Sequence, residues 1–441
     1  MSEERTTNSS GSLPQAAQTG SNSQTQGTFS KIWMVILFGF VAIAFTAVWV
    51  GIYGWLDKAI WSNDFVISHT WTIPVGVVFF SLLVGLTQRY LRAPTVIHGG
   101  FTESMRGGGH EKPDYLTFPG ALLSSYCSLL SGASVGPEGP LAFLIQDIAA
   151  WLGEKLRVAE DATFGLSVAA LASAYNGIVG SPVFTAVFAT EFQVGGKELS
   201  SAFLAWNLLA GAIGYLFFTL LKLPVFAQYI PFTPISTLTL PYVLYAILLG
   251  LVGSVLAMFI GGCFQFFGKV METFGNRVIL RTLVAGVIIA MVVYFVPEVM
   301  FAGVHQIFPM INNPAHFGVW LLLLFAVLKI LLLALSFKSG YLGGPIFPTL
   351  FASTMVALAL NLMFPTVPLS FLVLCIESAA VGLLLGAPLT AILLVAVVGT
   401  YNPYLIALMC LSTATAMFMG AGFKQLIARR AAGKAVAPAK E

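Results

Sequence analysis

The sequence predicts an all-α protein that crosses a membrane many times and contains an internal repeat built from broken helices. Only 9% of its 441 residues are charged and 58% are hydrophobic, whereas a soluble domain carries about 25% charged residues. Apolar runs long enough to span a bilayer recur along the chain, beginning with residues 33–55. Several other apolar runs are interrupted by glycine and proline. Together these observations place almost the whole chain inside a membrane.

The internal repeat is visible in two pairs of short segments. Residues 131–140 read SGASVGPEGP and residues 339–348 read SGYLGGPIFP, which agree at five of ten positions. A second pair keeps nearly the same offset, with GSPVFTAVF at 180–188 and GAPLTAILL at 386–394. Repeats of apolar segments broken by glycine and proline are typical of transporter folds, and the breaks indicate the binding site.

The repeat sets the predicted domain boundaries. We expect a first repeat at residues 31–222 and a second at residues 223–427. Residues 1–30 are mostly Ser, Thr, Asn, Gln and Gly without the apolar core of a signal peptide, which predicts a retained disordered tail. Residues 428–441 form a basic tail.

The distribution of positive charge predicts the orientation of the chain. Lys31 precedes the first apolar run, Arg89 and Arg92 follow the second, and the C-terminal tail is basic. The positive-inside rule therefore places both termini in the cytoplasm, with the protein in the plasma membrane, a bacterial inner membrane. A net charge of +3 is too small to indicate nucleic acid as a partner.

Residues that carry enzyme chemistry are dispersed. The four cysteines lie far apart in apolar stretches, without metal-ligand spacing. The five histidines are also scattered, and no nucleophile with a nearby base is recognisable. We therefore expect no metal, no cofactor and no enzymatic activity. A scaffold without transport activity is a further alternative.

Short apolar runs predict an anion site. Residues 116–130, 141–152 and 383–398 are short or broken, as in half-helices and re-entrant segments. Such helices can end inside a bilayer only where their free backbone groups face protein or water. Several helix N-termini that converge bind an anion through backbone N–H groups and helix dipoles.

Four motifs resemble those of a known family. GPEGP at 136–140 is similar to the GREGP signature of the CLC chloride channels and proton–chloride antiporters. In family order follow SPVF at 181–184, GGPIFP at 343–348, which resembles GGIFAP, and GAPLT at 386–390, which resembles APLT. The resemblance covers residues 33–425. It implies an inverted-topology repeat with broken and re-entrant helices, a homodimer in membrane lipid with one pore per subunit, and transport of chloride or a similar small anion, with proton antiport possible.

Within the first break, the resemblance identifies Glu138 as the external gate and proton acceptor. A charge inside a membrane costs about 2.5–3.5 kcal/mol, so it is rarely present without a task. At a helix start, the Glu138 carboxylate can occupy the place of an anion, and protonation then frees it to move away. Gly136, Pro137 and Gly139 are the neighbouring candidates for anion binding. The structural alternative is that Glu138 only caps a helix at an interface.

Two parts of the predicted anion site depart from the family. The GSGIP loop has no clean counterpart, and the best alignment sets His98 and Gly99 against it. A histidine there can donate to an anion and titrate near neutral pH, or be a structural histidine bonded to a carbonyl. In the second break Pro345 has no N–H to offer an anion. We therefore expect either that Ile346 and Phe347 supply the donors or that the site uses fewer donors.

The family's central tyrosine and internal glutamate also lack clean counterparts. Tyr401, Asn402 and Tyr404 compete for the tyrosine position, with Asn402 favoured by the ungapped alignment. An interfacial aromatic is the alternative for either tyrosine. Many antiporters have a Glu-Glu pair where this chain has Glu191 and Phe192, so a passive channel remains an alternative to proton antiport. A fluoride-handling transporter is another alternative, because that branch of the family also departs from the pattern in the first loop and near the central tyrosine. We expect Glu191 to tie a helix end or the intracellular surface.

Two other charged residues lie within apolar runs. Lys329 and Glu377 stand among leucines and other apolar residues. Each can pair with a partner, face water or take part in function, and the sequence does not choose between these roles.

Overall fold

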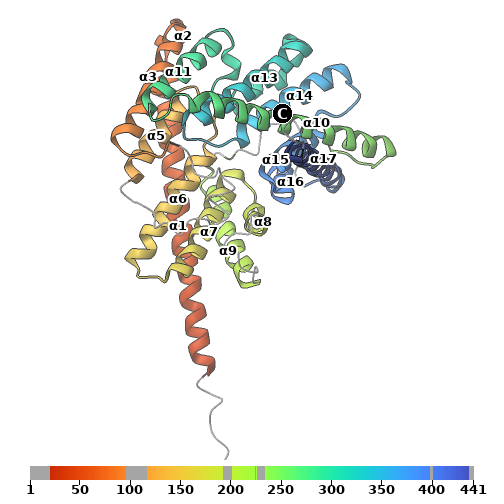
Figure 1. Cartoon of the computed structure of the whole chain (residues 1–441). Coiled ribbons are helices and arrows are strands. Elements are labelled where there is room, and N and C mark those ends of the chain that lie inside the picture. The colour runs from red at the N-terminus through yellow and green to blue at the C-terminus, as the bar shows by residue number, and fades with distance from the viewer. Residues whose placement is uncertain are drawn as a thin grey trace, which may run out of the picture.

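The computed structural model describes residues 20–95, 117–191, 201–223, 225, 234–397 and 401–436, and within these ranges the protein is built from helices and connecting loops (Figure 1). The first part contains α1 (Gly20–Trp61), α2 (Asp64–Ser68), α3 (Thr72–Tyr90), α5 (Phe118–Leu130), α6 (Glu138–Lys155), α7 (Glu160–Val179), α8 (Phe184–Glu191) and α9 (Ser201–Leu220). The second part contains α10 (Leu240–Glu272), α11 (Val278–Phe295), the short 3₁₀ helix η2 (Pro297–Val299), α12 (Ile307–Asn312), α13 (Pro314–Ser339), α14 (Ile346–Met363), α15 (Leu369–Leu385), α16 (Pro388–Ala396) and α17 (Pro403–Val436).

The helices have the length and composition of membrane-spanning segments. Among the described residues, nine helices are long and apolar enough to cross a bilayer, and α5 and α15 are shorter apolar helices. An 18-residue helix is about 27 Å long, close to the thickness of the hydrocarbon core. The 33 residues of α10 exceed what a perpendicular crossing needs, which favours a tilted helix. The predicted all-α, multi-spanning fold is confirmed.

The two halves of the chain contain equivalent bundles. In the first, α1, α7, α8 and α9 pack together, and in the second α10, α15, α16 and α17 do so. The bundles meet through α8 and α16. In both, a glycine in the left-handed conformation ends the central helix, with φ 76° at Gly180 and 68° at Gly386. Glycine adopts this conformation without the steric penalty that other residues meet, so the chain can turn into the following short helix.

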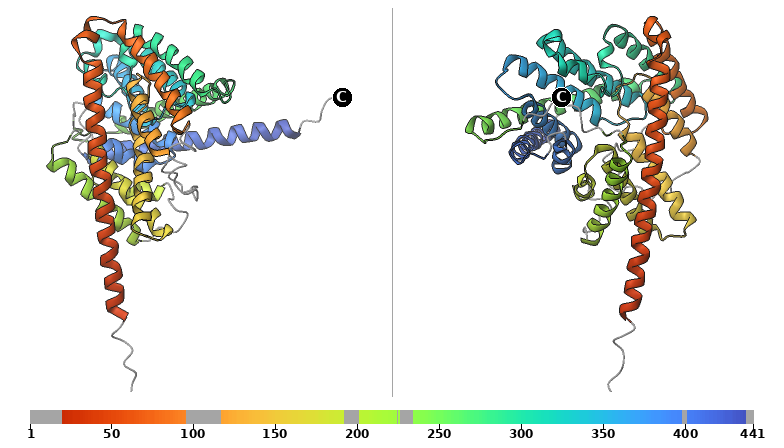
Figure 2. Two further views of the ribbon diagram at one scale, coloured as in Figure 1. Left: turned by 90° about the vertical axis from the view of Figure 1, so that its left-hand side faces the viewer. Right: turned by 180° about the vertical axis from the view of Figure 1, so that it is seen from behind.

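The predicted disorder of the N-terminal tail is partly wrong. Helix α1 begins at Gly20, so residues 20–30 are helical although their composition predicts disorder, while residues 1–19 lie outside the described residues. Helix α17 continues to Val436, so residues 428–436 of the basic C-terminal tail are helical. Figure 2 shows α1 and α17 projecting from the body of the molecule in different directions. Once a helix exists, each added residue gains one hydrogen bond at little cost, which allows such extensions.

Candidate functional site

The two sequence breaks meet in the structure. The N–H of Gly136 donates to the carbonyl of Gly344, and the N–H of Gly344 donates to the carbonyl of Gly136, both at 2.8 Å. These residues form an isolated antiparallel bridge, and they are equivalent positions of the repeated decapeptides. The bridge therefore holds the start of α6 beside the start of α14.

Glu138 lies at this junction as the first residue of α6. Its side chain is only 4% exposed, and its Oε1 accepts a hydrogen bond of 2.7 Å from the N–H of Ile346, the first residue of α14. The N–H of Phe347 also interacts with this carboxylate. Free N–H groups and the helix dipole make a helix N-terminus a binding site for anions. The Glu138 carboxylate thus caps the N-terminus of α14.

The hold on Glu138 is incomplete. Its second carboxylate oxygen, Oε2, is buried without a hydrogen-bond partner among the described residues. A buried carboxylate oxygen without a donor is costly. The carboxylate is therefore fixed by one end only, so it can leave α14 by breaking few contacts.

Glycines make room for this arrangement. A Cβ atom at Gly344 would collide with the Glu138 carboxylate, and one at Gly139 would collide with the backbone of Gly343. The close approach of the two breaks explains why these positions of the repeated motifs carry no side chain.

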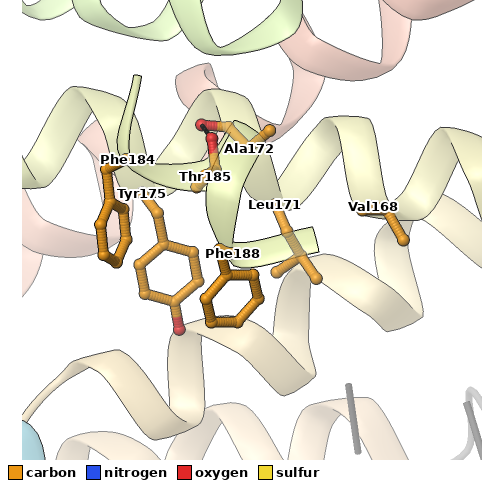
Figure 3. A pocket seen from close by; sticks show the side chains of 7 residues that line it. All are labelled: Val168, Leu171, Ala172, Tyr175, Phe184, Thr185 and Phe188. Atoms are coloured by element: carbon orange, nitrogen blue, oxygen red, sulfur yellow. Dashed lines mark hydrogen bonds between the residues drawn. The ribbon is translucent and has the colours of Figure 1, made fainter. Parts of the chain in front are cut away.

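A tyrosine that sequence reasoning did not single out also contacts the break. The hydroxyl of Tyr175, on α7, donates to the backbone carbonyl of Glu138. Its ring lies beside those of Phe184 and Phe188 along a small pocket between α7 and α8 (Figure 3). The one available signal is that Tyr175 is the single aromatic residue in the small-residue run at 169–177. Tyr175 therefore anchors the first turn of α6.

The other predicted residues of the two breaks are placed in part. Pro137 and Pro345 are the residues immediately before α6 and α14. Because Pro345 has no N–H, the first amide that α14 offers is that of Ile346, which binds Glu138. His98 and Gly99 lie outside the described residues. The role of all these residues in anion binding stays a prediction.

The residues that compete for the tyrosine position lie at the start of α17, which packs mainly on α10, α15 and α16. Asn402 caps this helix, since its Oδ1 accepts from the N–H groups of Tyr404 and Leu405 at 3.1 Å. Tyr401 shares a hydrogen bond of 3.1 Å with the hydroxyl of Ser181. Tyr404 is 40% exposed. The part of Tyr401, Asn402 and Tyr404 in anion binding stays a prediction.

A second glutamate caps another helix of the second repeat. The carboxylate of Glu191, the last residue of α8, accepts from the N–H of Leu389 through Oε1 and from the N–H of Thr390 through Oε2, each at 2.7 Å. Both amides belong to the first turn of α16. Glu191 thus ties a helix end, as the sequence predicts, and joins the two bundles.

Lys329 stabilises a loop that contacts the first break. Its buried ammonium donates to the three carbonyls of residues 299–301 and lies 4.6 Å from the centre of the Phe351 ring. The N–H of Phe301 in turn donates to the carbonyl of Gly132, at the beginning of the first break. The role that this geometry indicates is structural: Lys329 fixes a loop of the second repeat against the first break.

Comparison with known proteins fits this architecture. Residues 80–420 match the family described as voltage gated chloride channel. The chain belongs to that family. The candidate ion-transport protein YfeO of Escherichia coli O7:K1 is 24% identical over 413 residues, covering 92% of this chain and 93% of YfeO. The resemblance drawn from the four motifs is thereby confirmed, and the protein is an integral membrane protein of anion transport.

Two solved structures share the fold. One is a CLC-type fluoride/proton antiporter, with a TM-score of 0.73, 18% identity, and coverage of 91% of this chain and 97% of that one. The other is a slow cyanobacterial Cl⁻/H⁺ antiporter, with a TM-score of 0.72, 16% identity, and coverage of 89% and 94%. At these identities the likeness shows the fold alone.

Proposed function

We propose that Glu138 gates the anion pathway of this transporter by competing with the anion for the N-terminus of α14. One observation supports this above all: the buried Glu138 carboxylate accepts the N–H of Ile346 at 2.7 Å. A carboxylate and a small anion have the same charge and the same need for backbone donors, so only one of them can use this position.

The competition implies a coupling to protons. The ionised Glu138 carboxylate is attracted to the N-terminus of α14, whereas the protonated acid has lost the charge that this position favours. Binding of a proton therefore weakens the hold of α14 on Glu138 and opens the position to the anion. Return of the carboxylate expels the anion and releases the proton. Alternation of these states exchanges anions for protons.

Flux measurements on purified protein in liposomes test this mechanism. A chloride gradient imposed on the wild type should drive uphill proton movement. Glu138→Ala should abolish the proton movement and leave chloride flux, since it removes both the competitor and the proton acceptor. Glu154→Ala, which removes an exposed glutamate of the same helix, is the matched control and should behave as wild type.

The results separate the possible mechanisms. Persistent proton coupling in Glu138→Ala would show that the gate is another residue. Chloride flux without proton movement in the wild type would instead identify a passive channel.

The transported anion is proposed to be chloride, with fluoride as the second candidate. Fluoride is the second candidate for two reasons. The sequence departs from the family pattern at residues 97–101 and 399–405, and one structural neighbour is a fluoride/proton antiporter. Efflux of each anion from matched liposomes, followed with ion-selective electrodes, distinguishes them. A fluoride-to-chloride rate ratio near or below unity excludes a fluoride transporter.

We also propose that the protein is a homodimer of the bacterial inner membrane with both termini in the cytoplasm. The positive charge at Arg89, Arg92 and residues 424–440 supports this orientation. Reporter fusions to each terminus, active only on one side of the membrane, test the orientation. Mass measurement of the protein in lipid nanodiscs tests the dimer.

A further inference from the structure

A second buried carboxylate lies outside the site described above. Glu377, in the middle of α15, is only 4% exposed. It makes no ion pair among the described residues. An ionisable side chain within a membrane helix is costly and indicates a functional site. Its surroundings therefore need a physical account.

The Glu377 side chain forms a hydrogen bond with Thr354 of α14. Their Oε1 and Oγ1 atoms lie 2.8 Å apart, and the same Thr354 Oγ1 lies 2.9 Å from the backbone carbonyl of Leu350. A hydroxyl has one hydrogen to donate, so Thr354 can serve only one of these two acceptors. When Thr354 donates to Leu350, the hydrogen between Thr354 and Glu377 has to come from a protonated Glu377.

This geometry therefore has two states that differ by one proton. In the protonated state, Glu377 donates to Thr354 and Thr354 donates to Leu350. In the ionised state, Thr354 turns its hydrogen to the Glu377 carboxylate, while the Leu350 carbonyl retains the backbone bond of its helix position. Both states leave the contact between Glu377 and Thr354 intact. The hydroxyl can thus accommodate either form of the acid without moving a helix.

Among the residues that the structure describes, no cation stands close enough to fix Glu377 as a carboxylate. Helix α15 packs against α10, α14, α16 and α17, and among these α14 and α16 contain no ionisable residue. On α10, Gly253 faces residues 376–380, and the first cation, Lys269, lies about 24 Å further along the helix axis. On α17, Ser412 bonds to Cys375, and Lys424 lies about 18 Å further along.

The remaining ionisable groups on the packed elements do not provide a positive charge either. The described ones are Cys375 of α15, Tyr242, Tyr245, Cys263 and Glu272 of α10, and Tyr404 and Cys410 of α17. Neutral tyrosines and cysteines cannot neutralise a carboxylate, and Glu272 opposes it. Because the described residues around Glu377 supply no positive charge, its charge is removed by binding a proton.

Helix α14 links this carboxylate to the gate. Its first N–H, that of Ile346, binds Glu138, and Thr354 binds Glu377 eight residues later, about 12 Å along the helix axis. Between them on the face of Ile346 lies Ser353, whose buried hydroxyl has no hydrogen-bond partner among the described residues. Helix α14 thus contacts two carboxylates at two depths, that of Glu138 from α6 and that of Glu377 from α15.

We propose that Glu377 is a second proton-binding site of the transporter, with Thr354 as the partner that adapts to both of its states. Release breaks the O–H bond of Glu377 and hands the proton to solvent water, while Thr354 keeps its own hydrogen. Proton binding by Glu377 stands without the gate. Its participation in coupled transport rests on the proposed gating by Glu138.

Infrared difference spectroscopy of the full-length protein in lipid tests the binding directly, through the C=O stretch of a protonated carboxyl group. We expect two pH-dependent carboxyl bands, of which Glu377→Gln removes one and Glu138→Gln the other. Thr354→Val removes the donor that stabilises the ionised form and should move the Glu377 titration to more alkaline pH. Thr46→Val changes a buried threonine with the same backbone bond on α1 and should move neither band.

A Glu377 band that is absent, or present without change at every pH, overturns the proposal. Should Glu377→Gln fail to fold, the displacement caused by Thr354→Val in the presence of Glu377 carries the same test, and no displacement overturns the proposed pairing. In liposomes, Glu377→Gln should reduce proton flux to background with anion flux retained. Wild-type protein without proton-coupled flux would refute the proposed antiport and leave the infrared result unaffected.

Discussion

Two glutamates of the first repeat cap helices of the second repeat, and they are held in different ways. Glu191 gives both carboxylate oxygens to α16, one to each of two N–H groups. Glu138 gives one oxygen to α14, and its other oxygen is buried with no hydrogen-bond partner in the part of the chain that the structure describes. The first arrangement resembles a fully satisfied helix cap, whereas the second retains an unmet need for a donor.

The two glutamates also differ in what surrounds them. Glu191 is the last residue of the short helix α8 and is partly exposed, so water can form the hydrogen bonds that α16 does not supply. Glu138 is almost fully buried beside two glycines whose missing side chains leave it room. A carboxylate at a helix N-terminus therefore acts as a structural link between helices when both of its oxygens are paired. It becomes a candidate gate when one oxygen is paired and space is available.

The largest expected effect separates the two glutamates by pH. If Glu138 has to be protonated before an anion can enter, wild-type anion efflux should rise as the pH falls. The change can reach about tenfold per pH unit, because a single carboxyl changes its protonated fraction by that factor. Glu138→Gln should make efflux high and independent of pH, since the amide cannot ionise. Efflux from liposomes at a series of symmetric pH values measures this.

Glu191→Gln is the matched control for that experiment and should retain the wild-type pH profile. A pH profile that becomes flat in Glu191→Gln and stays steep in Glu138→Gln would reverse the assignment of gate and structural link.

A smaller effect is expected from a substitution that keeps Glu138 but fills the space of its carboxylate. In Gly344→Ala the new Cβ atom would collide with the carboxylate of Glu138, which has to withdraw from Ile346. We expect several-fold faster anion efflux at alkaline pH, with the acid still present and able to titrate. Gly165→Ala, at a helical glycine with open space around it, should leave efflux unchanged. Equal pH profiles for Gly344→Ala and wild type would show that the contact with Ile346 does not limit entry.

The sequence predicted the breaks better than the contacts made across them. Glycine and proline leave a visible pattern, so the equivalence of residues 131–140 and 339–348 could be recognised before the bridge between Gly136 and Gly344 was known. The partner of Glu138 is a backbone N–H, and every residue except proline has one. Pro345 leaves Ile346 as the first backbone donor of α14, but no composition or spacing shows that its acceptor is Glu138, and only the three-dimensional structure identifies this pair.

The structural role of Asn402 follows from a local rule, whereas its part in anion binding stays a prediction. Asparagine is a favoured N-cap and proline a favoured first helical residue, and Asn402 followed by Pro403 is that combination. The structure follows the local rule, with Asn402 capping α17. The helix at residues 20–30 was not predicted either, because composition alone does not reveal that a helix can extend into a polar segment.

The smallest effect on transport is expected at Glu191, where the change should appear in stability. Glu191→Ala leaves the N–H groups of Leu389 and Thr390 without their acceptor and loosens the contact between α8 and α16. The loss of such a cap costs about 1–2 kcal/mol, so the unfolding temperature of the protein in detergent should fall while the ratio of protons to anions stays at the wild-type value. Glu154→Ala, at an exposed position, should leave the unfolding temperature unchanged. A Glu191→Ala variant of normal stability that has lost proton coupling would mean that a fully paired carboxylate can also act as a gate, and the number of paired oxygens would then no longer distinguish the two.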